Sequence, residues 1–179
     1  MGIANAPRFL YRRLVSNELE LRRATLADRA LVFTFHRALY VTHRDRILPP
    51  DILELIGYRD FESVLREDVE AMLKSDQTMV FLGMEKGRAV GYISGRIHQE
   101  PRRLLRRRGV IEDWYVDEAQ RGKGYGRVLL LGLEATLREA GCELLESATW
   151  AFNDSARRAH DALGFKEVQI QYRKRIDGD

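Results

Sequence analysis

One stretch, residues 110–126, constrains the fold of this chain more than any other. Its sequence is VIEDWYVDEAQRGKGYG, an apolar strand with two carboxylates that leads directly into a loop with glycine at 122, 124 and 126. Glycine has no Cβ, so such a backbone can turn tightly and present successive N–H groups to one point. The stretch therefore predicts a strand followed by an anion-binding loop.

A helix is expected immediately after this loop, over residues 127–140. Leu129, Leu133 and Leu137 recur with helical spacing and share one face of this helix. Charged residues such as Glu134 and Arg138 lie on the remaining faces. The first-turn N–H groups and the positive end of the helix dipole point back toward the loop. Loop and helix together predict a binding site for a phosphate-like anion.

Two common phosphate-binding motifs do not fit the loop. A Walker loop requires Ser or Thr after Gly-Lys, but here Gly122-Lys123 is followed by Gly124. A Rossmann fingerprint has the spacing G-x-G-x-x-G, which these glycines do not follow. The pattern that fits is R-x-x-G-x-G, formed by Arg121, Gly124 and Gly126 after the strand phrase IEDWYVD.

The sequence resembles the GCN5-related N-acetyltransferase (GNAT) family, because the strand, the loop, the helix and the later segment 153–165 follow one another in the order typical of that family. The resemblance extends over residues 19–176 and implies that the loop binds the pyrophosphate of acetyl-coenzyme A (acetyl-CoA). It assigns contacts with the coenzyme to two groups of residues. These are Arg121, Gly122, Lys123, Gly124, Tyr125, Gly126 and Arg127 for the pyrophosphate, and Trp114, Tyr115, Val116 and Asn153 for the pantetheine arm. Asn153 is also expected to be a helix N-cap.

The remaining sequence predicts an α/β (α+β mixed) fold. Residues 1–17 form an N-terminal extension, and residues 18–179 form a single domain. Besides the strand before the glycine loop, strands are expected over 19–24, 79–84, 89–97, 144–152 and 166–176, and helices over 25–41, 52–56, 61–73 and 154–163. The resemblance implies a three-layer α/β/α arrangement around a mixed, mostly antiparallel sheet with a splayed central strand.

Composition narrows the function further. The chain has 179 residues and a mild formal net charge of +3, so no nucleic-acid partner is expected. Cys142 is the single cysteine and the four histidines are scattered, so we expect no metal site and a reducing cytoplasm. The absence of a long apolar run predicts no membrane segment. The arginines of residues 102–108 indicate a solvated connection or, alternatively, contact with an acidic partner.

The chemistry that the resemblance implies is direct attack of a primary amine on the thioester of acetyl-CoA in a ternary complex. A protonated amine has no free lone pair, so a base must first accept a proton. Glu112 matches a glutamate that serves as the base in some family members. The structural alternative for Glu112 is pairing with an arginine. Asp113 is expected on the opposite face of the strand, where it would be structural or would orient the acceptor.

His160 is the candidate general acid for the departing thiolate. Many family members have a tyrosine at this position, seven residues after the asparagine that corresponds to Asn153. This is the main departure from the family pattern, but histidine can donate a proton near neutral pH, so the substitution is compatible with the acid role. Helical spacing places His160 on the inward face of its helix, where a hydrogen-bonded core residue is the alternative interpretation.

The acceptor is less constrained. Residues 28–75 contain nine acidic and seven basic residues, which favours a small cationic amine of the aminoglycoside or polyamine type. Some aminoglycoside-modifying family members share a histidine at position 160, the following Leu-Gly-Phe and an ending like Tyr172-Arg173-Lys174. A protein N-terminus or lysine is an alternative acceptor, and a non-catalytic acyl-CoA-binding or sensing module is an alternative function. The family also suggests a homodimer.

Overall fold

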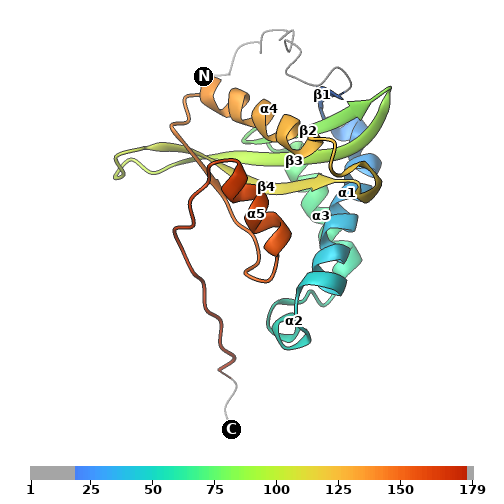
Figure 1. The fold of residues 1–179 in the computed structure, drawn as a ribbon, viewed down its shortest axis with the longest axis vertical. Coiled ribbons are helices and arrows are strands. Elements are labelled where there is room, and N and C mark those ends of the chain that lie inside the picture. The colour runs from blue at the N-terminus through green and yellow to red at the C-terminus, as the bar shows by residue number, and fades with distance from the viewer. Residues whose placement is uncertain (1–18, 177–179) are drawn as a thin grey trace.

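The computed structural model describes residues 19–176 (Figure 1), so the N-terminal extension that we predicted lies outside the described residues. Five strands form one sheet in the spatial order β1-β2-β3-β4-β5. Their bounds are β1 (Leu19–Arg23), β2 (Thr78–Glu85), β3 (Arg88–Gln99), β4 (Arg107–Val116) and β5 (Leu144–Ser147). The pairs β1–β2, β2–β3 and β3–β4 are antiparallel, and the pair β4–β5 is parallel. The predicted mixed, mostly antiparallel sheet is confirmed.

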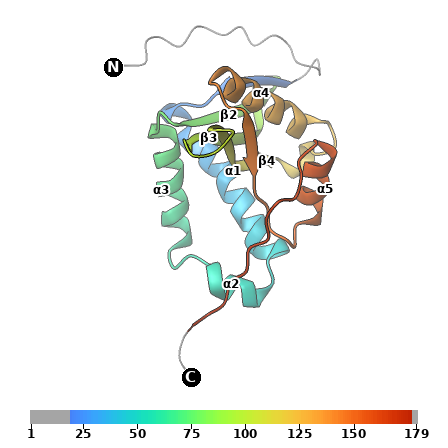
Figure 2. The same cartoon turned by 90° about the vertical axis from the view of Figure 1, so that its left-hand side faces the viewer.

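Helices cover both faces of the sheet. The helices are α1 (Arg29–Thr42), α2 (Pro50–Ile56), α3 (Phe61–Lys74), α4 (Tyr125–Glu139) and α5 (Asp154–Ala162), and the short helical turns are η1 (Leu26–Asp28), η2 (His43–Ile47) and η3 (Glu118–Gln120). Helices α1 and α3 lie on one face and α4 on the other (Figure 2). This is the three-layer arrangement that the resemblance implied.

The two cores follow from side-chain alternation along the strands. Phe81 and Ile93 pack with the leucines of α4, whereas their neighbours Leu82 and Tyr92 pack with Val32 and other residues of α1 and α3. Successive strand residues point to opposite faces, so each strand serves both cores. The central strands can therefore be buried over several consecutive residues.

Local capping explains where several helices begin. The side chain of Thr25 and the carboxylate of Asp28 form the predicted reciprocal capping box at η1. Asn153 Oδ1 accepts a hydrogen bond from Ala156 N at 3.1 Å, which confirms it as the N-cap of α5. The helix after the glycine loop begins at Tyr125, two residues earlier than the sequence suggested.

The strand predicted over residues 144–152 is wrong beyond Ser147. Strand β5 ends there, and the chain turns so that Asn153 N donates to Trp150 O at 2.9 Å. The apolar residues after Ser147 resemble a strand in sequence. However, Asn153 begins α5, and the chain has to leave the sheet before that point.

The strand predicted over residues 166–176 is also wrong within this chain. The segment is extended but pairs with no other strand in the described part of the chain, and β5 remains the edge of the sheet. An alternating pattern specifies an extended backbone with two faces, but a strand also needs a neighbour for its N–H and C=O groups. Within residues 19–176, no strand supplies that neighbour.

Candidate active site

The centre of the candidate site is a bulge in β4 at the point where β4 and β5 separate. Strand β4 pairs with β5 only from Arg108 to Ile111. On its other side, Ser94 of β3 pairs with Asp113 and Gly95 pairs with Ile111, so Glu112 has no partner in the register. A bulge of this kind bends the strand and reorients its side chains. Among the residues that the structure describes, the last residues of β4 therefore have β3 on one side and no strand on the other.

The glycines of the loop have two different roles. Gly122 and Gly124 both have φ of +80°, a backbone conformation that other residues adopt only with strain, and a Cβ added at either would meet no atom within 4 Å. Gly126 lies inside α4, where an added Cβ would be 3.4 Å from the ring of Trp114. The first two glycines shape an open loop, and the third allows strand and helix to approach.

Contacts between β4 and the loop fix their relative positions. Trp114 Nε1 donates to Gly126 O at 3.1 Å, and Arg121 Nε donates to Val116 O at 3.2 Å. Lys123 Nζ lies 2.6 Å from Gln120 Oε1. These bonds connect the predicted pantetheine-contacting residues to the predicted pyrophosphate-binding residues.

Tyr125 contributes to the core rather than to the loop surface. Its ring is buried beside β1 and β3, and its hydroxyl donates to the carboxylate of Glu85, which lowers the pKa of Glu85. Lys123 Nζ reaches the same carboxylate at 3.3 Å. The Tyr125 side chain therefore supports the loop from beneath, which leaves only its backbone to face a ligand there.

The loop has the properties that a pyrophosphate requires. Gly124 is the N-cap of α4 and has no side chain that could accept from the first-turn N–H groups. Arg121, Lys123 and Arg127 are exposed around it and supply positive charge. Backbone N–H groups at a helix N-terminus together with such cations form a good anion site. In contrast, no group of His, Cys, Asp and Glu side chains that could hold a metal ion occurs within residues 19–176.

His160 lies at the opening between β4 and β5. Its ring packs edge-on against Trp114 and Phe165, with centroids 5.7 and 5.1 Å apart. Nδ1 is 2.7 Å from Ala156 O, and Nε2 is 2.7 Å from Ser147 Oγ. A carbonyl oxygen can only accept, so Nδ1 carries the proton, and Nε2 of the neutral ring accepts from the Ser147 hydroxyl. Sequence reasoning missed Ser147, which lay unmarked within the predicted strand.

The two carboxylates of β4 lie in contrasting environments. Glu112 is exposed, and its Oε1 is 2.6 Å from Arg96 Nε, which is the arginine pairing considered as the structural alternative. Asp113 is buried and faces α1, with only 6% of its surface exposed. The bulge interrupts the strict alternation on which we based the expected positions of both side chains.

Asp113 belongs to a buried polar cluster that sequence reasoning missed. Its Oδ2 is 3.3 Å from both Ser94 Oγ and His36 Nδ1, and His36 Nδ1 is 2.9 Å from the hydroxyl of Tyr92. Burial, with the added charge of Asp113, raises the pKa of Tyr92 well above its usual value, so the phenol stays protonated and donates. The spacing of His36 with Val32 on α1 was the available signal that this histidine points inward.

Three further titratable groups on the same side of the sheet have shifted pKa values, and the charge of Asp113 contributes to each shift. Burial and the charge of Asp113 raise the pKa of Tyr40, while burial lowers the pKa of His43 against the opposing effect of the same charge. Burial also raises the pKa of Asp68. This side of β4 therefore presents carboxylates with aromatic rings and an imidazole that favours its neutral form.

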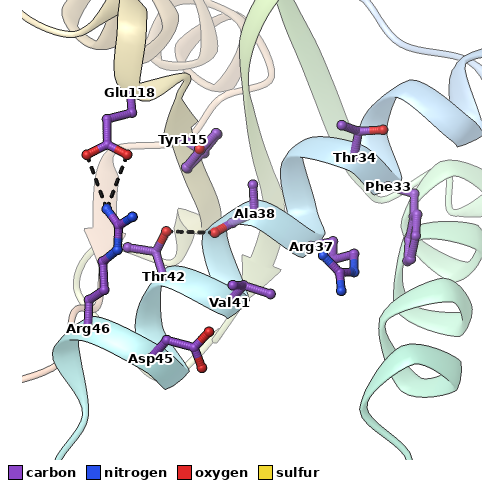
Figure 3. A pocket seen from close by; sticks show the side chains of 10 residues that line it. All are labelled: Phe33, Thr34, Arg37, Ala38, Val41, Thr42, Asp45, Arg46, Tyr115 and Glu118. Atoms are coloured by element: carbon purple, nitrogen blue, oxygen red, sulfur yellow. Dashed lines mark hydrogen bonds and ion pairs between the residues drawn. The ribbon is translucent and has the colours of Figure 1, made fainter.

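A cavity of about 480 Å³ lies on the outer side of α1, beside the end of β4 (Figure 3). Among the predicted site residues, Tyr115 lines it. Arg46 Nη1 bonds both carboxylate oxygens of Glu118 across its mouth, each at 3.2 Å, and Arg37 and Asp45 add one charge of each sign. The cavity thus has balanced charge and lies apart from Glu112 and His160.

Comparison with known proteins agrees with this geometry. The profile of the Acetyltransferase (GNAT) family matches residues 50–165, and the chain belongs to this family. It is an acyl-CoA-dependent N-acetyltransferase whose co-substrate is acetyl-CoA. A curated relative, the aminoglycoside N(6')-acetyltransferase type 1 of Stenotrophomonas maltophilia, is 29% identical over 119 residues, which cover 65% of this chain and 78% of the relative.

Two solved structures show the same fold. AAC(6')-Iy in complex with the bisubstrate analogue CoA-S-monomethyl-acetylneamine superposes with a TM-score of 0.68 at 22% identity, covering 89% of this chain and 99% of that one. A ribosomal-protein-alanine N-acetyltransferase from Brucella melitensis biovar Abortus superposes with a TM-score of 0.65 at 17% identity, covering 88% and 99%. In the described part of this chain, no helix is long and apolar enough to cross a membrane.

Proposed function

We propose that this acetyltransferase transfers the acetyl group to a primary amine of a small cationic acceptor, by direct attack within a ternary complex. Aminoglycosides are the favoured class, and polyamines are the second. The observation that carries the proposal is the bulge at Glu112, because it places a carboxylate next to the opening between β4 and β5 that His160 lines. We further propose that the enzyme works in the reducing cytoplasm, with Cys142 as a free thiol.

The acceptor class is supported by charge and by relatives. Asp113 and Asp68 lie on the side of β4 that faces α1 and α3, and their charge favours a cationic ligand. The curated relative from Stenotrophomonas maltophilia is named for acetylation of aminoglycosides. An aminoglycoside carries several ammonium groups, so the exposed Asp68 with the buried charge of Asp113 suits it better than the mixed charges of the cavity in Figure 3.

Glu112 is the proposed proton acceptor. It is exposed to solvent, and the pairing with Arg96 can open at small cost because both side chains are near the surface. The amine reaches the active site as an ammonium ion, and Glu112 takes its proton directly or through a water molecule. The neutral nitrogen then attacks the thioester carbonyl. Backbone N–H groups of Trp114 to Val116 are the proposed donors to the developing oxyanion.

His160 is the proposed proton donor to the thiolate. The N–H at Nδ1 of His160 donates to Ala156 O, so the proton that can be transferred is the one on Nε2 of the imidazolium form. Nε2 also contacts Ser147 Oγ, so the proton can pass through the serine hydroxyl as that hydroxyl donates its own proton to sulfur. The C–S bond breaks, the S–H bond forms and His160 is left neutral, while the amide nitrogen releases its second proton to solvent.

The proposal is tested by following release of the free coenzyme thiol from acetyl-CoA in the presence of a panel of amines. The panel contains aminoglycosides, polyamines and peptides with a free N-terminus or lysine. We expect turnover with aminoglycosides that is lost in Glu112→Gln. The matched control is Glu118→Gln, because Glu118 is also exposed and paired with an arginine, Arg46. Equal activity of the two variants would remove Glu112 from the mechanism.

The same panel separates the alternative functions. Turnover confined to peptides would assign the enzyme to protein N-termini or lysines. No turnover with any amine, while acetyl-CoA still raises the melting temperature, would support a binding or sensing module. In that case the exposed arginines of the β3–β4 connection, such as Arg103 and Arg106, become the first candidates for a docking surface.

A further inference from the structure

The hairpin that joins β3 to β4 projects beyond the rest of the sheet (Figure 1). Strand β2 pairs with β3 only as far as Arg96, and β5 pairs with β4 only from Arg108 onward. Past these two points, no other strand of residues 19–176 flanks the hairpin. Glu100 N donates to Arg106 O at 2.8 Å and closes the turn. Residues 100–106 therefore form a hairpin tip that stands clear of the sheet.

The five arginines of residues 102–108 divide into two groups, and the first group belongs to the body of the domain. Arg108 Nη1 pairs with Glu146 Oε1 of β5 at 3.0 Å, and both side chains are only partly exposed. Arg107 is half-buried beside Gly141, at the end of α4. These two arginines attach the base of the hairpin to its neighbours.

The second group of arginines lies at the tip. Arg102 Nε pairs with Glu100 Oε1 at 3.1 Å. Arg103 and Arg106 are exposed, and no ion pair joins either of them to a carboxylate of residues 19–176. With one glutamate and three arginines, the tip has a formal charge of +2. It therefore presents two guanidinium groups that the domain itself does not neutralise.

Two leucines lie between the arginines of the tip. Leu104 is 99% exposed and Leu105 is 42% exposed. Each would gain free energy on leaving water for an apolar medium. The order of side chains is Arg-Arg-Leu-Leu-Arg, so positive charge flanks the apolar pair on both sides. The tip thus combines an exposed apolar end with cations that would meet an anionic surface around it.

We propose that this tip binds the surface of an anionic phospholipid bilayer, with Leu104 entering the interface and Arg103 and Arg106 contacting lipid phosphates. Basic side chains are attracted to such a surface, and apolar side chains enter the boundary between headgroups and acyl chains. Guanidinium groups bind phosphate through paired hydrogen bonds. Because the contact is small and mostly electrostatic, the binding is reversible and weakens with salt.

The size and composition of the tip favour a bilayer over a macromolecule. A stable protein interface needs about 20–30 residues on each side, many more than residues 100–106 provide. A bilayer needs no complementary pocket, so a narrow tip can enter it. Single-stranded nucleic acid is bound through aromatic side chains that stack on bases, and the tip contains none.

The position of the tip leaves the coenzyme loop accessible. Strand β4 has 10 residues and connects the hairpin at its start to the glycine loop at its end. At about 3.3 Å per residue, the tip and the loop are separated by about 30 Å or more along this strand. A domain held at a bilayer by the tip can therefore still bind acetyl-CoA from water. The inference does not depend on which amine is acetylated.

Co-sedimentation of the full chain with vesicles provides the first test. We expect binding to vesicles of equimolar phosphatidylcholine and phosphatidylglycerol, and no binding to phosphatidylcholine alone. Each arginine near such a surface contributes about fivefold to affinity, so Arg103→Gln/Arg106→Gln should weaken binding by about 25-fold. The matched control Lys86→Gln/Arg88→Gln removes two exposed charges from the β2–β3 turn and should have little effect. No binding to anionic vesicles, or equal weakening by both double variants, would overturn the proposal.

A second test concerns the apolar end of the tip. Leu104→Ser should weaken vesicle binding by about tenfold or more, whereas Ile176→Ser, at a side chain 89% exposed elsewhere, should not. In a Cys142→Ala background, an environment-sensitive dye attached through Leu104→Cys should shift its emission to the blue on anionic vesicles. The same dye attached through Arg88→Cys should not shift. A dye at position 104 that remains in water would refute insertion of the tip.

The same variants distinguish a lipid surface from an acidic macromolecule. Single-stranded RNA and polyglutamate replace the vesicles in the binding assay. Tighter binding to either polymer than to anionic vesicles, lost in Arg103→Gln/Arg106→Gln but retained in Leu104→Ser, would assign the tip to an acidic macromolecule and overturn the proposal. None of these assays requires turnover, so their outcome is independent of the proposed acetylation.

Discussion

The adjacent carboxylates of β4 should respond in opposite ways to neutralisation, because one is buried and the other is exposed. We expect Asp113→Ala to destabilise the fold and Glu112→Gln to reduce catalysis with little effect on stability. Asp113 accepts from the buried hydroxyl of Ser94 beside Tyr92 and His36, whereas Glu112 contacts only Arg96 among the pairs resolved around it. The two substitutions therefore separate structural from chemical roles within two residues.

The expected magnitudes follow from burial. Removing the acceptor of a buried hydrogen bond costs about 1–3 kcal/mol, because the remaining donors lose their partner without regaining water. For a domain of this size, about 1 kcal/mol lowers the melting temperature by about 2–4 °C, so Asp113→Ala should lower it by roughly 2–12 °C. The Glu112–Arg96 pair has side chains 37% and 49% exposed, and such a pair contributes about 0–1 kcal/mol.

The order of the two variants should be reversed for catalysis, with Glu112→Gln reducing kcat more than Asp113→Ala. Loss of a general base reduces the rate by about 10²–10⁴-fold, so Glu112→Gln should lose at least two orders of magnitude in kcat. The assays are thermal unfolding by circular dichroism and thiol release at 25 °C, where both variants are still folded. The reasoning is refuted if folded Asp113→Ala loses turnover while Glu112→Gln retains it, because the proton acceptor would then be Asp113.

Three further predictions concern the glycine loop, His160 as the general acid, and the dependence of stability on pH. Gly124→Ala should lower stability by about 1–2 kcal/mol, because Gly124 has a positive φ, and it should also raise KM for acetyl-CoA. The control is Gly87→Ala in the β2–β3 turn, where φ is nearly the same, and this variant should lower stability without changing KM. His160→Phe should lower kcat with little change in KM for acetyl-CoA, and an unchanged kcat would remove it as the acid. Arg22 lowers the pKa of Asp28 to about 2, so its stabilisation is complete above about pH 4 and disappears as the pH falls toward 2. In acid titrations monitored by chemical denaturation, Asp28→Asn should therefore show a weaker loss of stability over that interval.

Local sequence was enough to predict the conformation of the glycine loop and the start of α5. The glycines at 122 and 124 act through their own backbone conformation, and Asn153 caps the helix that begins at the next residue. Such interactions extend over a few residues, so motif and spacing describe them nearly completely. The order of the predicted strands and helices and the amphipathic pattern of α4 likewise predicted the layers of the fold.

Only the tertiary structure decided the surroundings of the proposed catalytic residues. The bulge at Glu112 is a property of the register between β3 and β4, and no residue of β4 signals it alone. The cluster of Asp113 with His36 joins residues far apart in the sequence, as does the bond between Ser147 and His160. The C-terminal segment makes the same point, because its alternating residues determine an extended backbone but not a partner. Long-range contacts depend on how separate elements pack, whereas propensity and capping act within one element.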